Sequence, residues 1–256
     1  MTTTIALSVS YNGSGFAGFA RQPGQRTVQG QLESALATAL RCEVETVGAG
    51  RTDAGVHALE QVVSFEIGTA VDRSTLLRSL NALVGEGIVV TGVREAPPGF
   101  SARHSAIARE YRYRIVPGPV PPLFLAPYAW WVKNTLSLGP MHEAAAALLG
   151  EHDFRSFCVA SSAEGIRTFR RLDVVDIAPE MVMGEHTLVV RVVGNAFLHS
   201  MVRTIVGSLV EVGTGRRPPE WMAGALAACD RTTAGPTAPA HGLTLWHVSY
   251  PDECWL

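Results

Sequence analysis

The sequence predicts an α+β fold built around a mostly antiparallel sheet. Segments with strand character and segments with helical spacing alternate along the 256 residues. Several of the predicted strands also alternate polar with apolar residues, whereas the strands of a buried parallel sheet read as continuous apolar runs. We therefore expect helices on one face of the sheet and a cleft on the other.

The first half of the predicted fold covers residues 1–105. Apolar residues alternate along 5–11, as in a half-buried strand. Thr27 can cap a helix over 28–41, because its hydroxyl can accept a hydrogen bond from the first helical turn. The other expected elements are strands at 43–48, 58–67 and 87–95 and a helix at 73–83.

The second half covers residues 106–256. Residues 107–116 alternate again, and the proline-rich stretch 117–127 indicates a boundary or a connection. A helix predicted over 196–212 follows a Gly-Asn turn and carries an apolar stripe. The stripe consists of Phe197, Met201, Ile205 and Leu209. The remaining predictions are helices at 140–149 and from Pro218 or Pro219 to Cys229, and strands at 168–178, 186–193 and 243–250.

The composition is typical of a soluble globular protein, with 47% hydrophobic and 17% charged residues. No apolar run reaches the roughly 18 residues that would span a bilayer. The start of the sequence, MTTTIALSVSYNG, lacks the cationic segment and apolar block of a secretory signal. We therefore expect a cytoplasmic protein that does not interact with membranes.

The cysteines and histidines do not form a recognisable ligand pattern. Cys42, Cys158, Cys229 and Cys254 are far apart and include no CxxC pair. The histidines show no HExxH or similar spacing. The sequence therefore predicts neither a metal site nor a disulfide framework.

The positive charge of this chain is carried almost entirely by arginine. The formal net charge of −2 does not by itself predict a nucleic-acid partner. Lys133 is the only lysine, and arginines cluster at 103–114 and 167–171. Arginine suits bidentate contact with phosphate and stacks on bases, although a GC-rich genome would give the same bias.

Residues 13–18, GSGFAG, match the GxGxxG pattern of dinucleotide-binding folds. Such a fold needs a helix that begins directly after the glycines and meets the pyrophosphate. Pro23 and Gly24 interrupt any such helix, and helical spacing begins only at Val28. We therefore do not expect a nicotinamide or flavin cofactor.

The stretch 48-GAGRTDAGVHA-58 is more specific. Its glycines permit positive φ and close approach of a ligand. Asp53 is expected at the tip, where the nearby Arg51 favours the ionised carboxylate. A positioned carboxylate can attack a carbon atom of a sugar or base. The same pattern also suits an aspartate that hydrogen-bonds its own turn.

Two further stretches can contribute to a site. REYRYRI (109–115) places Tyr111 and Tyr113 on one strand face between arginines, as in a surface that stacks bases, or as a core-facing aromatic pair. Arg203, in 194-GNAFLHSMVRTIVGSL-209, lies away from the apolar stripe of its predicted helix. It can reach a carboxylate in a cleft, or it can face solvent.

Together these stretches resemble the tRNA pseudouridine synthase A family. GRTDAGVHA resembles its catalytic-aspartate motif, and ARxYRYxI and NAFLHSMVRTIVGSL resemble its later motifs. FSARHSA, LLGEHDFRSF and the tail DRTTAGPTAPAHGL…VSYP fit as well. The motifs occur in the family's order from about residue 5 to residue 252.

The resemblance implies a pseudouridine synthase fold, with two α+β halves around a continuous antiparallel sheet and a cleft between them. Residues 1–105 would carry the aspartate loop, and 106–256 the tyrosine strand and the arginine helix. The implied activity converts uridine to pseudouridine at positions 38, 39 and 40 in the tRNA anticodon stem-loop. The family acts as a homodimer, with the tRNA across both subunits, and uses neither a metal nor an organic cofactor.

The resemblance also assigns roles to residues. Asp53 would be the nucleophile, or the group that assists cleavage of the glycosidic bond. Tyr111 would stack on the target base and could take its C5 proton. Arg203 would pair with Asp53, and Arg51 would fill the gap left by the flipped nucleotide. His57 would give structural support.

RNA contacts are expected at Arg21, Gln22, Arg109 and Arg112. The sequence departs from the family at GFAGFARQ (15–22), where Phe19 and Ala20 stand in the places of a tryptophan and a glutamine. We expect this departure to affect RNA binding more than catalysis. The alternative is a tRNA-binding or chaperone protein of the same fold with little or no turnover.

Overall fold

The computed structural model describes residues 2–254. The chain divides into two compact units, here called unit 1 (Met1–Arg109 with Leu245–Leu256) and unit 2 (Glu110–Thr244). The C-terminal segment therefore groups with the beginning of the chain, whereas the sequence assigned it to the second half. The predicted halves, 1–105 and 106–256, and the cleft between them stay predictions.

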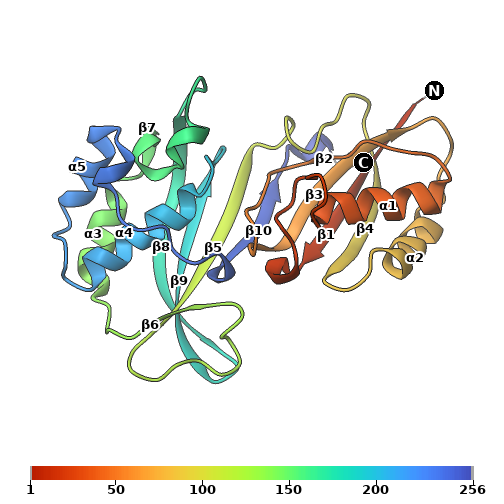
Figure 1. The fold of residues 1–256 in the computed structure, drawn as a ribbon. Helices are drawn as coiled ribbons and strands as arrows, with labels where there is room; N and C mark the ends of the chain where they lie inside the picture. Colours follow the sequence, from red (N-terminus) through yellow and green to blue (C-terminus); the bar gives the residue numbers. More distant parts are fainter. Residues whose placement is uncertain (1, 255–256) are drawn as a thin grey trace. The chain divides into compact units, whose positions relative to one another are not determined.

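Unit 1 has strands in the order β4-β1-β3-β10, with β2 beside β3. Strand β1 pairs antiparallel with both β3 and β4, and β2 pairs antiparallel with β3. Helices α1 and α2 contact one another, and α2 packs against β4 (Figure 1). The bounds are β1 (Thr3–Tyr11), α1 (Val28–Leu40), β2 (Val47–Gly48), β3 (His57–Ile67), α2 (Arg73–Leu83), β4 (Ile88–Ala96) and β10 (Leu243–Ser249).

Both helices of unit 1 begin at side-chain caps. The Thr27 hydroxyl accepts a hydrogen bond from the Gly30 N–H at 3.2 Å, as the sequence predicts. Asp72 caps α2 by accepting from the N–H groups of Ser74 and Thr75. These bonds satisfy donors that the first helical turn cannot satisfy internally, and they fix where each helix begins.

Unit 2 has strands in the order β5-β9-β8-β7. The β7–β8 and β8–β9 pairs are antiparallel, and the short β6 pairs with β5 in parallel. Helices α4 and α5 both contact α3, which packs against β8 (Figure 1). The bounds are β5 (Ala108–Pro117), β6 (Trp130–Val132), α3 (Leu138–Ala146), β7 (Gly150–Asp153), β8 (Phe169–Val182), β9 (Glu185–Gly194), α4 (Met201–Gly213) and α5 (Trp221–Ala228). The predicted α+β class with mostly antiparallel strands is confirmed.

Two predicted helix boundaries are wrong. Helix α4 begins at Met201 instead of 196, because Ser200 adopts a left-handed conformation with φ 58° and the Met201 N–H donates to the Leu198 carbonyl in a turn. Phe197 therefore precedes the helix. Helix α3 ends at Ala146 instead of 149, because the chain tightens into short-range turns before Gly150, whose φ is 98°.

Several properties of the described residues bear on other expectations. Within residues 2–254, no helix is long and apolar enough to span a bilayer. The same residues contain no group of three or more His, Cys, Asp or Glu side chains that could hold a metal ion. Cys42, Cys158, Cys229 and Cys254 are free thiols.

Candidate active site

The segment 48–55, called here the Asp53 loop, connects β2 to β3 within unit 1, and its backbone is held by hydrogen bonds along its length. The Ala49 N–H donates to the Val62 carbonyl at 2.8 Å. The Thr52 carbonyl accepts from the Phe19 N–H at 3.0 Å, and the Asp53 carbonyl accepts from the Val56 N–H at 3.1 Å. The position of Asp53 is therefore fixed from both sides.

Buried side chains hold other points of the same loop. Gln61 on β3 donates through Nε2 to the Gly50 carbonyl at 2.8 Å. The Tyr11 hydroxyl lies 2.8 Å from the Thr52 hydroxyl oxygen. Burial raises the pKa of Tyr11 to about 12, against the opposing effect of hydrogen bonds with Thr52 and Gln61, so its hydroxyl stays protonated at neutral pH.

These contacts orient the three residues at the loop's centre differently. Thr52 is buried, whereas Arg51 is exposed and Asp53 is half-buried. The side chain of Thr52 points into the core, so Arg51 and Asp53, on either side of it, lie on the outer side of the loop. This arrangement suits a loop that presents both groups to a ligand.

The GSGFAG stretch packs closely against the Asp53 loop, and this explains two of its glycines. A Cβ on Gly13 would lie 2.0 Å from the Val56 carbonyl oxygen. A Cβ on Gly18 would lie 2.9 Å from the Thr52 carbonyl oxygen, and the φ of Gly18 is 102°. Both positions therefore need glycine for the approach of two backbones, without a bound dinucleotide.

His57 supports the same packing. It is buried, and its Nδ1 accepts a hydrogen bond from the Gly13 N–H at 3.1 Å. An accepting Nδ1 carries no proton. His57 therefore holds the two loops together, in keeping with the structural support expected of it.

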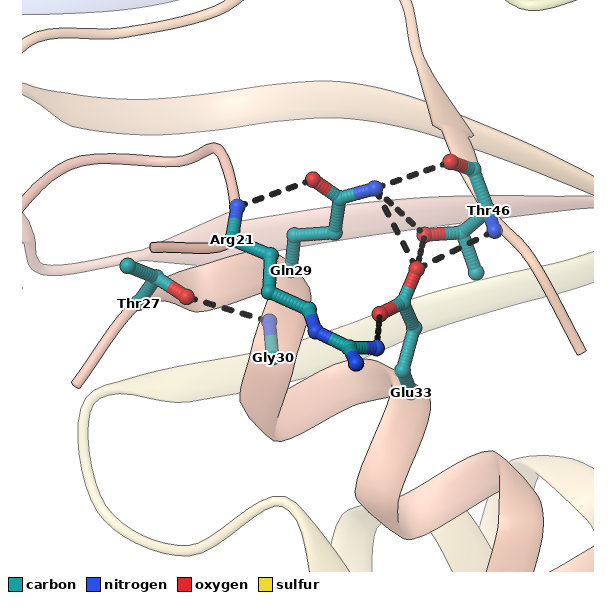
Figure 2. A network of polar contacts seen from close by, with 6 residues as sticks. All are labelled: Arg21, Thr27, Gln29, Gly30, Glu33 and Thr46. Carbon is teal, nitrogen blue, oxygen red and sulfur yellow. Dashed lines mark hydrogen bonds and ion pairs between the residues drawn. The ribbon is translucent and has the colours of Figure 1, made fainter. Parts of the chain in front are cut away.

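Arg21 and Gln22 are exposed residues of the segment that connects β1 to α1. The Arg21 guanidinium forms an ion pair with Glu33 at 3.2 Å. The Arg21 backbone N–H donates to the Gln29 side chain, and Figure 2 shows both contacts. Glu33 also accepts from the Thr46 hydroxyl at 2.9 Å, which ties α1 to the segment before β2. The network fixes the base of the Arg21 side chain, although that side chain keeps 73% of its surface exposed.

Arg109 is a buried arginine whose guanidinium is bound by backbone carbonyls. It is only 9% exposed, and its guanidinium donates to the backbone carbonyls of Ala49, Arg103 and Ala106 at 2.7–3.3 Å. These bonds tie the base of the Asp53 loop to the FSARHSA segment. The geometry favours an anchoring role over contact with RNA.

Arg112 belongs to unit 2 and lies on a charged face of β5. Its Nε bonds Glu110 at 2.7 Å, and Arg191 bonds the same carboxylate at 2.9 Å. Burial alone would raise the pKa of Glu110, but the hydrogen bonds from Arg191 and Arg112 bring it below its usual value. Arg112 and Arg191 also line a pocket of about 220 Å³ with Asp176 and Glu180.

Tyr111 and Arg203 also belong to unit 2. Tyr111 is 7% exposed, and its ring lies edge-on to that of Phe197, with 5.0 Å between centroids. Arg203 is half-buried, and its Nε donates to the Ala238 carbonyl at 2.8 Å. Tyr113 is fully buried and donates to the Pro239 carbonyl, so the second tyrosine of the YRY motif belongs to the core.

The structure thus places Asp53 and Arg51 together in unit 1, and Tyr111 and Arg203 in unit 2. Phe197, which contacts Tyr111, lies in the segment before helix α4, which begins at Met201 and carries Arg203. Tyr11 and Gln61 were missed as functional candidates. Their signal in the sequence is weak: a tyrosine at the end of a strand, and a glutamine among the apolar residues of another.

Comparisons with known proteins identify the family of this chain. A family model described as tRNA pseudouridine synthase matches residues 7–86 and 144–251. A tRNA pseudouridine synthase A of Geobacillus kaustophilus is 42% identical over 99% of this chain and 97% of its own length. One of Frankia casuarinae is 45% identical over 97% of this chain and 90% of its own.

Among solved structures, a chain of a Cbf5-Nop10-Gar1 complex matches with 16% identity and a TM-score of 0.36, over 80% of this chain and 45% of that chain. The matches to the family model and to the relatives extend over most of this chain, with the GRTDAGVHA, YRY and arginine-helix motifs inside the aligned length of the relatives. The chain therefore belongs to the tRNA pseudouridine synthase family of isomerases.

Proposed function

We propose that this enzyme isomerises uridine to pseudouridine at positions 38, 39 and 40 of the tRNA anticodon stem-loop, with Asp53 as its nucleophile. The observation that carries the proposal is the Asp53 loop. Its backbone is hydrogen-bonded from Ala49 to Asp53, and it presents a half-buried carboxylate beside the exposed Arg51. A fixed carboxylate lowers the cost of reaching an attacking geometry.

The isomerisation needs no redox partner, because its atoms and electrons balance within the uridine. The N1–C1′ bond breaks with its electron pair going to the uracil, and C1′ develops oxocarbenium character. The uracil turns, C5 bonds to C1′, the C5 hydrogen leaves as a proton, and N1 gains a proton. Asp53 would act at the cleavage step, by bonding to the sugar or the base or by taking the 2′ proton.

Three other side chains complete the proposal. Tyr111 would stack on the target base and receive the C5 proton. Arg203 would pair with Asp53, and its Nε bond to the Ala238 carbonyl supports a fixed guanidinium plane for that pair. Arg51 is exposed, as a residue that fills the place of a flipped nucleotide must be.

We further propose that the enzyme acts in the cytoplasm as a homodimer, with the tRNA across both subunits. Arg21 and Gln22 are exposed residues of unit 1 that would contact the RNA backbone. Arg112 would contact it from unit 2. Arg109 is omitted from this set, because its guanidinium is bound to backbone carbonyls.

The test uses unmodified tRNA transcripts with uridine at 38, 39 and 40 and matched transcripts with cytidine there. Pseudouridine is mapped after carbodiimide treatment and reverse transcription. The proposal predicts stops at the three positions in the first set and no pseudouridine in the second. Modification of the cytidine-substituted transcripts would contradict the assignment of position. Binding of both sets without any pseudouridine would favour the tRNA-binding alternative.

A further inference from the structure

The buried face of the Asp53 loop rests on a chain of polar side chains within unit 1. Tyr11, at the end of β1, is 5% exposed, and its hydroxyl meets that of Thr52 at 2.8 Å. Gln61, in the middle of β3, is completely buried and bonds the Gly50 carbonyl at 2.8 Å. Gln61 Nε2 also lies 3.5 Å from the Tyr11 hydroxyl oxygen, which joins the two anchors.

A glutamine at this position is costly for the core. The next residues of β3, Val62 and Val63, are buried and apolar. Gln61 Oε1 is buried, and the described residues supply it with no hydrogen-bond partner. A buried polar atom without a partner destabilises the fold, so its presence calls for an explanation. The hydrogen bond from Gln61 Nε2 to the Gly50 carbonyl of the loop explains why a glutamine stands here.

The anchors alternate with the groups that the loop presents. Gln61 holds Gly50, directly before Arg51. Tyr11 holds Thr52, between Arg51 and Asp53. Moving either anchor would therefore rotate the backbone from which both charged side chains extend.

We propose that Tyr11 and Gln61 are positioning residues, which set the orientation of Asp53 and Arg51 by holding Thr52 and Gly50. This inference rests on the proposed role of Asp53. The two residues act through the loop and do not touch the substrate. Their removal should therefore lower kcat by a larger factor than it raises the KM for tRNA, because the exposed Arg21 and Gln22 do not depend on these anchors.

The test is a double-mutant cycle with near-isosteric changes, Tyr11→Phe and Thr52→Val. A misplacement of about 1 Å can cost up to roughly 100-fold in rate, so each single variant should lose about 10- to 100-fold in kcat. The double variant should lose no more than the worse single variant, since both remove the same hydrogen bond. Thr52→Ser keeps the hydroxyl and should keep kcat within about threefold of the wild type, on the same reasoning.

Tyr250→Phe is the matched control. Tyr250 is another buried tyrosine of unit 1, and its hydroxyl donates to the Ala102 carbonyl of the FSARHSA segment at 2.6 Å. Urea denaturation should show a similar loss of stability for Tyr250→Phe and Tyr11→Phe, and only Tyr11→Phe should lower kcat. Equal kcat losses in the two variants, or additive losses in the cycle, would overturn the proposal.

Gln61→Met removes the donor while keeping the length and apolar body of the side chain. It should lower kcat as Tyr11→Phe does, again by a larger factor than any rise in KM, because Arg21 and Gln22 stay in place. A kcat equal to that of the wild type would remove Gln61 from the proposal.

Hydrogen exchange separates this proposal from the function on which it rests. Amides of residues 50–54 should exchange faster in Tyr11→Phe and Gln61→Met than in the wild type, and at the wild-type rate in Tyr250→Phe. Faster exchange in an enzyme that forms no pseudouridine would support the anchoring while the proposed function fails. Unchanged exchange would contradict the anchoring whatever the activity.

Discussion

Arg51 and Asp53 extend from one loop, on either side of a residue that is anchored in the core. Thr52 is 7% exposed and meets Tyr11, whereas Arg51 is exposed and Asp53 half-buried. A carboxylate that is partly shielded and rigidly held interacts more strongly with a developing positive charge than a fully hydrated one. The exposed arginine remains available to the RNA.

Tyr111→Phe tests the proposed proton acceptor at the residue scale. The ring packs edge-on against Phe197, and loss of the hydroxyl leaves that packing in place. We expect turnover to fall by about 100-fold or more, in the range of general base catalysis, with tRNA affinity within about threefold. Single-turnover assays and filter binding measure the two quantities. Normal turnover would exclude Tyr111 as the acceptor and leave its stacking role.

Arg203→Lys and Arg203→Ala test the expected pair with Asp53. Lysine keeps the charge but loses the Nε donor that binds the Ala238 carbonyl, so both variants should lose kcat and alanine should lose more. Arg216→Ala is the control, because its exposed side chain pairs with Glu211. A loss of tRNA affinity larger than the loss of kcat would make Arg203 a phosphate contact.

The sequence indicated the Asp53 loop as a candidate site, but it could not distinguish buried from exposed arginines. Arg109 was expected to bind RNA, but it is buried. Its guanidinium donates to the carbonyl of Ala49, a residue far from it in the sequence. The same limit applies to Gln61, whose partner Gly50 lies on another segment. Contacts of this kind arise from tertiary packing, which no local pattern encodes.

The long elements were predictable because each spans several repeats of its pattern of apolar residues. Strands β1, β3 and β9 and helices α1 and α2 lie within a few residues of their predicted bounds. β6 (Trp130–Val132) and β7 (Gly150–Asp153) were missed, because three or four residues cannot display a period and their pairing partners are distant in sequence. The start of α4 was missed because an unexpected left-handed residue, Ser200, precedes it.

Asp72→Ala tests the cap of α2 through its pH dependence. Hydrogen bonds from Ser74 and Thr75 lower the pKa of Asp72 from 3.8 to about 2. The ionised cap therefore stabilises the fold fully above pH 4, and this contribution is lost as the pH falls towards 2. We expect a lower Tm for Asp72→Ala at pH 7.

The difference in Tm between wild type and Asp72→Ala should shrink between about pH 4 and pH 2. Thermal melts followed by circular dichroism measure it where unfolding remains reversible. Asp72→Asn is the control, because asparagine also caps helices but carries no charge that titrates. A difference that stays constant down to pH 2 would show that the charge of Asp72 does not contribute.

For the whole molecule, the sequence predicted the α+β class, which the structure confirms, and the family, which the comparisons confirm. It did not predict that Leu245–Leu256 would group with the N-terminal unit. The last strand could be recognised from its own residues, but its neighbour in the sheet, β3, is set by long-range pairing. The residues of a segment decide whether it forms a strand, whereas contacts with distant segments decide which compact unit it joins.

The net charge of −2 and the reliance on arginine predict salt-sensitive tRNA binding. The logarithm of the association constant should fall linearly with the logarithm of the salt concentration. Arg21→Gln should reduce the magnitude of that slope by about 0.7–0.9, the value for one phosphate contact. Arg41→Gln, also exposed in unit 1, should leave the slope unchanged. Equal slopes for wild type and Arg21→Gln would exclude Arg21 as a phosphate contact.

The proposed role of Asp53 is to carry out the chemistry. It is tested most directly by tritium release from tRNA that contains [5-³H]uridine, since formation of pseudouridine must expel the C5 hydrogen. Wild type, Asp53→Ala and the isosteric Asp53→Asn are compared at tRNA concentrations that saturate each protein. We expect release from the wild type and none above background from either variant, with tRNA still bound. Release from Asp53→Asn at the wild-type rate would contradict this role.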